Sequence, residues 1–259
     1  MNEESLKDFT QLEIPREVPE QAVMKPPTLL YNGMLHPFIG YTIKGALWYQ
    51  GESNRNRAKE YQELFPAMID FWRSQWNQGD FPFYFVQIAP FGYKDGNAAY
   101  LREAQMLTMK NTINTGMAVT MDIGECRFIH PKEKKLVGER LAYWALSKNY
   151  GIEGIAFSGP IYRNMKRKDD GKIEVSFDYA ENGLSSFSNE LTGFEIAGED
   201  RQFYPAMAQL NWNKTVNVWS KEVPSPVAVR YAFNNCIHGT LFNNEGLPAS
   251  SFRTDVWEE

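Results

Sequence analysis

The chain has 259 residues, of which 43% are hydrophobic and 23% charged, and its formal net charge is −5. This composition is ordinary for a globular protein with a sizeable core. A negative net charge without a broad basic field argues against nucleic acid as a partner. No apolar run approaches the roughly 20 residues of a membrane span, and the acidic start MNEESLKDFT is unlike a signal peptide, so no membrane contact is expected.

Residues 1–28 are rich in Glu and Pro and lack hydrophobic periodicity, which predicts an extended N-terminal segment. From residue 29 to residue 151, strand patterns alternate with helix patterns. This alternation predicts right-handed parallel crossovers and a three-layer α/β/α sandwich around a parallel sheet. The predicted strands are 41–49, 81–89 and 115–123, and the predicted helices are 59–78, 98–111 and 131–150.

The pattern changes after Gly151, and we place a domain boundary near residue 152. Short apolar runs, separated by turn signals such as Asp170-Gly171 and Asn182-Gly183, continue to the end of the chain. Regularly spaced short strands predict a small antiparallel β-sandwich-like module over residues 152–259. The predicted strands are 155–157, 172–177, 191–197, 202–206, 215–219 and 226–231.

The two cysteines, Cys126 and Cys236, lie far apart in the sequence and have no metal-type spacing. A disulfide framework is therefore not predicted, and both thiols are expected to be free.

A polar cluster follows the first predicted strand, in the segment LWYQGESN. Ligands of parallel sheets bind outside the carboxyl ends of the strands, so Gln50, Gly51, Glu52 and Asn54 are candidates for the lip of an active site. The alternative is an ordinary strand-to-helix turn in which Asn54 caps the helix.

A second polar corner, from Asp122 to His130, follows the third predicted strand. A histidine there can act as a general base when a carboxylate fixes its tautomer, and Asp122 and Glu125 are the local candidates. The amide of Gln50 and the N–H of Gly51 can donate to a developing oxyanion. A metal-dependent phosphatase or nuclease using these acids and His130 is the weaker interpretation, because one histidine and two loosely spaced acids make a poor metal site.

Several long motifs then resemble those of bacterial sialate O-acetylesterases, which are carbohydrate esterases of the SGNH-hydrolase superfamily. The similarity extends from about residue 27 to residue 255. The segments that carry it are LLYNGMLHPFIGYTIKGALWYQGESN, PFYFVQIAPF, LREAQ, MDIGECRFIHPKEKKLVGERLA, GFEIAGEDRQFYPA, VAVRYAF and EGLPASSFRTD.

The resemblance implies hydrolysis of acetyl esters of sialic acid or a similar sugar by a serine–histidine mechanism without a metal or organic cofactor. His130 matches the family's catalytic histidine, and the WYQGES block supplies an oxyanion donor, expected to be the Gln50 side chain. Trp48, Tyr49 and Asn54 become candidates for contacting the sugar. Relatives of this family are typically periplasmic or secreted.

Two departures from the family pattern stand out. Arg127 and Phe128 occupy the positions where an acidic residue usually precedes the histidine, which leaves Glu125 or Asp122 as substitutes. No Gly-Gln-Ser block occurs in this sequence, and the position of Ser53 matches a family residue that is not the nucleophile. The chain is therefore expected to be the C-terminal portion of an esterase and inactive alone; the alternative is a non-catalytic carbohydrate-binding or scaffold module.

In this superfamily the serine-bearing strand pairs with the strand that ends in WYQGE. Without it, the apolar edge along residues 43–49 would be unpaired, and such edges recruit partners. We expect this edge to be covered by the N-terminal segment, by the missing portion of the enzyme or by a second copy of the chain.

Overall fold

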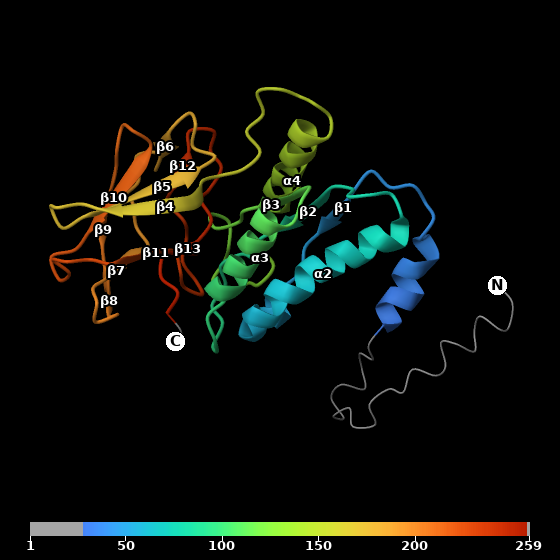
Figure 1. Ribbon diagram of the computed structural model, residues 1–259, viewed down its shortest axis with the longest axis horizontal. Helices are drawn as coiled ribbons and strands as arrows, with labels where there is room; N and C mark the ends of the chain where they lie inside the picture. The colour runs from blue at the N-terminus through green and yellow to red at the C-terminus, as the bar shows by residue number, and fades with distance from the viewer. Residues whose placement is uncertain (1–27, 258–259) are drawn as a thin grey trace, which may run out of the picture. The chain divides into compact units, whose positions relative to one another are not determined.

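The computed structural model describes residues 28–257 (Figure 1). The chain divides into two compact units between Thr42 and Ile43. The described part of the first unit contains the helical turns η3 (Tyr31–Leu35) and η4 (His36–Phe38). The predicted extended segment lies, except for residue 28, outside the described residues. Within the described part of the chain, no helix combines the length and hydrophobicity that a bilayer crossing requires.

The second unit begins with a parallel three-stranded sheet of order β1-β2-β3, which confirms the predicted fold class. Its strands are β1 (Ala46–Trp48), β2 (Phe83–Val86) and β3 (Thr115–Ala118), each shorter than predicted. The helices are α2 (Ala58–Trp76), α3 (Ala99–Asn111) and α4 (Lys134–Lys148), close to the predicted ranges.

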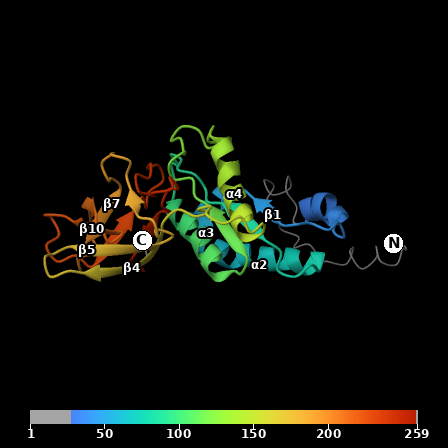
Figure 2. The ribbon, with the colours of Figure 1, turned by 90° about the horizontal axis from the view of Figure 1, so that it is seen from above.

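Side chains alternate across this sheet, as the strand geometry requires. Phe83, Phe85 and Met117 pack with the apolar residues of α2 and α3. Tyr84 and Val86 face the opposite way and pack against α4. The sheet is therefore covered by helices on both faces, which gives the three-layer arrangement (Figure 2).

The C-terminal half forms antiparallel sheets, as predicted. Two have four strands, in the orders β4-β5-β10-β9 and β13-β11-β7-β8, and a third pairs β12 with β6. The predicted strand at 155–157 is absent, and β4 was not predicted. The strands are β4 (Ile161–Arg167), β5 (Ile173–Asp178), β6 (Leu184–Ser185), β7 (Phe194–Ala197), β8 (Phe203–Pro205), β9 (Met207–Leu210), β10 (Thr215–Trp219), β11 (Ala228–Tyr231), β12 (Phe242–Asn243) and β13 (Phe252–Arg253).

Helix α3 is hydrogen-bonded to this β module. The guanidinium of Arg102 donates from Nε to Ser251 Oγ at 3.0 Å, and Glu103 forms an ion pair with Arg253 at 2.9 Å. Because Arg102 is fully buried, its bond to Ser251 lies inside the protein. The predicted boundary near residue 152, between the α/β domain and the β module, stays a prediction.

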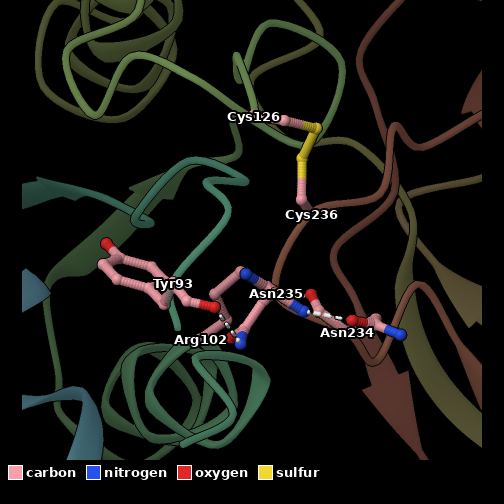
Figure 3. Close-up of a disulfide and its surroundings, with 6 residues drawn as sticks. All are labelled: Tyr93, Arg102, Cys126, Asn234, Asn235 and Cys236. Atoms are coloured by element: carbon pink, nitrogen blue, oxygen red, sulfur yellow. Dashed lines mark hydrogen bonds between the residues drawn. A yellow bond between two sulfur atoms is a disulfide. The ribbon is translucent and has the colours of Figure 1, made fainter. Parts of the chain in front are cut away.

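The prediction of free cysteines was wrong, because Cys126 and Cys236 form a disulfide (Figure 3). Their Cα atoms are 5.5 Å apart although 110 positions separate them in the sequence. The loop after β3 and the loop after β11 meet only in the folded chain, so no local spacing could indicate the pairing.

Candidate functional site

The two predicted polar corners lie at the same edge of the sheet. Because β1, β2 and β3 are parallel, their carboxyl ends point the same way, with β2 between the other two. Neighbouring strands are about 4.8 Å apart, so the ends of β1 and β3 are about 10 Å apart. The start of α4, which follows the His130 corner, reaches the Gln50 corner, since Lys134 Nζ lies 4.9 Å from the ring centroid of Tyr49. We call this edge the rim.

The Gln50 side chain is held in place by two neighbours. Its Nε2 donates to Asn54 Oδ1 at 2.8 Å, and the hydroxyl of Tyr61 donates to its Oε1 at 3.4 Å. A primary amide carries two N–H groups, so one donor of Gln50 remains for a ligand. Asn54 was predicted to bind the sugar or to cap a helix; its Oδ1 orients Gln50, and the contact with a sugar stays a prediction. Within the described part of the chain, no side-chain cap bond forms at the turn η5 (Glu52–Arg57).

Gly51 adopts a backbone conformation that side chains disfavour, with φ of +153°. A Cβ there would lie 3.2 Å from the side chains of Ile88 and Leu101 and 3.3 Å from Gln105 Nε2. The close packing fixes the direction of the Gly51 backbone at the start of η5.

The histidine corner begins with a tight turn in which the Phe128 N–H donates to the Glu125 carbonyl at 3.1 Å. His130 follows and is exposed. The Glu125 carboxylate lies 3.5 Å from Lys132 Nζ and accepts the Lys132 backbone N–H at 3.3 Å.

Asp122, the other predicted orienting carboxylate, is bonded to Arg140 of α4. The two oxygens of Asp122 accept from Nη1 and Nη2 of Arg140 at 2.7 Å and 2.6 Å. Such a bidentate pair is strong and directional. Among the described residues, no hydrogen bond or ion pair joins His130 to either acid. An orienting role for Asp122 or Glu125 therefore stays a prediction.

Trp48 packs on the inner face of the sheet. Its ring centroid lies 5.6 Å from that of Trp72 in an edge-to-face arrangement, and 6.5 Å from that of Phe83. This position favours a packing role for Trp48 over contact with a sugar.

Tyr49 lies at the rim with Tyr93, a residue that the sequence analysis missed. Burial raises the pKa of Tyr49 to about 12, with added contributions from Glu52 and Tyr93. Burial likewise raises the pKa of Tyr93 to about 12, and the charge of Glu52 adds to it. Both hydroxyls are buried without a hydrogen-bond partner among the described residues. Both phenols therefore stay neutral and can donate to a bound molecule.

A cavity of about 660 Å³ lies beside η5, lined by residues that include Arg57, Tyr100 and Arg253, but not by Gln50 or His130. The rim is thus an open edge next to this cavity. Among residues 28–257, no group of three His, Cys, Asp or Glu side chains could hold a metal ion.

Residues 23–146 match the family model described as carbohydrate esterase, sialic acid-specific acetylesterase. A crystal structure of a carbohydrate acetylesterase from Xanthomonas citri superposes with a TM-score of 0.83 and 41% identity, covering 90% of this chain and 55% of that one. In fold and in sequence the chain is thus similar to this carbohydrate acetylesterase.

Curated relatives narrow the family. The sialate O-acetylesterase of Mus musculus is 30% identical over 186 residues, covering 63% of this chain and 34% of that protein. The same enzyme of Rattus norvegicus is 34% identical over 173 residues, covering 58% and 32%. The chain is related to the sialate O-acetylesterases, and it spans about a third of the length of these two relatives.

Proposed function

We propose that this chain supplies the histidine and the oxyanion donors of a carbohydrate esterase that removes O-acetyl groups from sialic acid or a similar sugar. The observation that carries the proposal is the parallel pairing of β1, β2 and β3, because it puts the Gln50 corner and the His130 corner at the same edge of the sheet. The relatives named as sialate and carbohydrate acetylesterases support the choice of substrate class.

In the proposed reaction, a serine hydroxyl attacks the acetyl carbonyl while His130 takes its proton. Negative charge develops on the carbonyl oxygen, and the free N–H of Gln50 and the backbone N–H of Gly51 donate to it. The bond to the sugar oxygen then breaks, and His130 returns the proton to that oxygen. Water releases acetate from the serine by the same steps, so the chemistry requires no metal or organic cofactor.

We place the proposed serine in the part of the related enzymes that this chain does not cover. Ser53 is exposed on η5 beside the rim, and we assign it no nucleophilic role. Tyr49 and Glu52 lie where they can line the sugar site, and the unpaired hydroxyl of Tyr49 is the stronger candidate for direct contact.

The open edge of β1 is the proposed docking place for the remaining part. Among the described residues β1 pairs with β2 alone, and Leu47 is 66% exposed. The Xanthomonas citri relative has a longer chain, of which this chain covers 55%. We propose that a strand from the corresponding remainder pairs with β1; pairing with a second copy would instead appear as a dimer in light scattering.

The test is hydrolysis of p-nitrophenyl acetate by the chain alone and by the chain mixed with the uncovered part of the Xanthomonas citri enzyme. Activity in the mixture only supports the proposal. Activity of the chain alone would show that it carries its own nucleophile. Hydrolysis in neither sample, together with binding of O-acetylated sialic acid seen by NMR, would favour a non-catalytic carbohydrate-binding module instead.

A further inference from the structure

We propose that Asn235, a residue of the β module, is a positioning residue for the His130 loop. The inference rests on the proposed function, in which His130 is the general base. Asn235 lies one position before Cys236, beside Tyr93 and Arg102 (Figure 3). It belongs to the loop after β11. Its own contacts reach the loop that follows β2, and the adjacent Cys236 is bonded to the loop that follows β3.

Asn235 binds the loop after β2 with both its side chain and its backbone. Its Oδ1 accepts the Ala98 N–H at 2.7 Å, and its Nδ2 donates to the Gly96 carbonyl at 2.8 Å. Its own carbonyl oxygen accepts the Phe91 N–H at 3.0 Å. One half-buried asparagine therefore spans this loop from end to end.

The loop after β11, which contains Asn235, also holds the loop after β3. Cys236 is bonded to Cys126, which lies four positions before His130. The Cys126 carbonyl accepts the Gly92 N–H at 3.0 Å, and the Gly239 N–H donates to the Met121 carbonyl at 2.9 Å. The loop that carries His130 is thus tied to the β module and, through Gly92, to the loop that Asn235 holds.

The loop after β11 is anchored in the core by Arg102 of α3. Its Nη2 donates to the carbonyl oxygens of Asn234 at 2.5 Å and of Ala232 at 3.3 Å. Burial lowers the pKa of Arg102 to about 10, which leaves its guanidinium charged at neutral pH. Charged donors make strong bonds, so the Asn234-Asn235 backbone is a firm point of attachment.

His130 needs such external support because it is exposed and, within residues 28–257, forms no hydrogen bond or ion pair with Asp122 or Glu125. A misplacement of about 1 Å in a catalytic group can lower a rate about a hundredfold. The β module, in this view, completes the esterase by fixing the base. Asn235 acts through the loops and does not touch the substrate.

The test uses the whole chain with isotope-labelled histidine. The sequence has three histidines, so the ring signals of His130 can be followed with His36 as an internal reference. In Asn235→Ala we expect the ring signals of His130 to shift and those of His36 to remain unchanged. Hydrogen exchange at Ala98 should become roughly tenfold faster, as the loss of one hydrogen bond implies.

Two variants serve as controls. Asn244→Ala removes an exposed asparagine whose Nδ2 bonds the Asn182 carbonyl at 2.6 Å, and it should leave exchange and the His130 signals unchanged. Asn235→Asp keeps the acceptor for Ala98 and loses the donor to Gly96, so it should restore protection at Ala98. Addition of a reductant to the parent should mobilise residues 122–130, as the tie through Cys126 predicts.

Activity supplies the readout that a purely structural role would not move. In the complemented assay, Asn235→Ala should lower kcat about tenfold and leave KM unchanged, since the base and not the substrate is displaced. If the parent chain mixed with the complementing part does not hydrolyse the ester, the proposed function fails. Hydrogen exchange at Ala98 and the ring signals of His130 then still decide whether Asn235 positions the His130 loop. The inference is overturned if Asn235→Ala behaves like Asn244→Ala in those two measurements.

Discussion

Gln105 of α3 donates a hydrogen bond from its side-chain Nε2 to the carbonyl oxygen of Gln50 at 3.3 Å. The same amide accepts the Ile88 N–H at 2.9 Å and donates to the Val86 carbonyl at 3.1 Å. A fully buried side chain thus connects the corner after β1 to the end of β2. The candidate oxyanion donors depend on this connection for their position.

Replacing Gln105 with Ala should therefore destabilise the fold. The change leaves buried backbone groups unsatisfied and opens a small cavity, and we expect a loss of about 2 to 4 kcal/mol in the free energy of unfolding. Urea denaturation followed by tryptophan fluorescence measures it. The exposed Gln202→Ala variant is the control, with an expected change within about 0.5 kcal/mol. Equal stabilities would contradict the connecting role of Gln105.

Replacing Asp122 with Ala should affect stability because it leaves the buried Arg140 guanidinium without its carboxylate. The Asp122 side chain is 17% exposed, so we expect a loss of about 2 to 4 kcal/mol, below that for a fully buried pair. Asp70→Ala breaks a 3.9 Å pair between the exposed Asp70 carboxylate and Arg73, and it should cost less than about 1 kcal/mol.

Alkaline pH should unfold the protein at pH values between 10 and 12. Burial raises the pKa values of Tyr49, Tyr61, Tyr93 and Tyr231 from 10.0 to about 12. Above pH 10 the unfolded chain loses these protons while the folded chain keeps them, so stability is full below pH 10 and falls as pH rises toward 12. Tyrosinate absorbance and circular dichroism should change together; early ionisation of these tyrosines in folded protein would refute the account.

Replacing His130 with Ala should lower the activity of the complemented enzyme by about 10²- to 10⁴-fold, as expected for loss of a general base. Gln50→Ala should lower kcat by about 10²- to 10³-fold, as loss of an oxyanion donor does. His36→Ala, in the other compact unit, is the matched control. Full activity in His130→Ala would remove the basis of the proposed mechanism.

Thiol labelling should find no reactive cysteine in the native chain until a reductant is added. Because the disulfide closes a long loop, the double variant Cys126→Ser with Cys236→Ser should lose about 2 to 4 kcal/mol of stability. Mass spectrometry of maleimide-treated samples, with and without reductant, checks the first expectation. Two labelled thiols without reductant would contradict it.

The sequence by itself determined the layers and the order of the elements in the α/β part of the chain, from β1 to α4. The stripe of apolar residues in 59–78 and the continuous apolar run in 81–89 depend on local periodicity, and α2 and β2 formed there. The parallel order then placed the Gln50 and His130 corners at one edge, because parallel strands end on the same side. The ordered motifs likewise indicated the similarity to the sialate O-acetylesterases.

Only the tertiary structure decided the partners of the side chains. Asp122 and Glu125 were expected beside His130, and instead they bond Arg140 and Lys132. Cys126 found Cys236 across 110 positions. A pairing of this kind depends on which loops the packed layers bring together and on which charged group lies within reach after burial. Local periodicity does not specify which loops meet or which charged group lies within reach. The hydrogen-bonded geometry of the rim was therefore decided only by the folded chain.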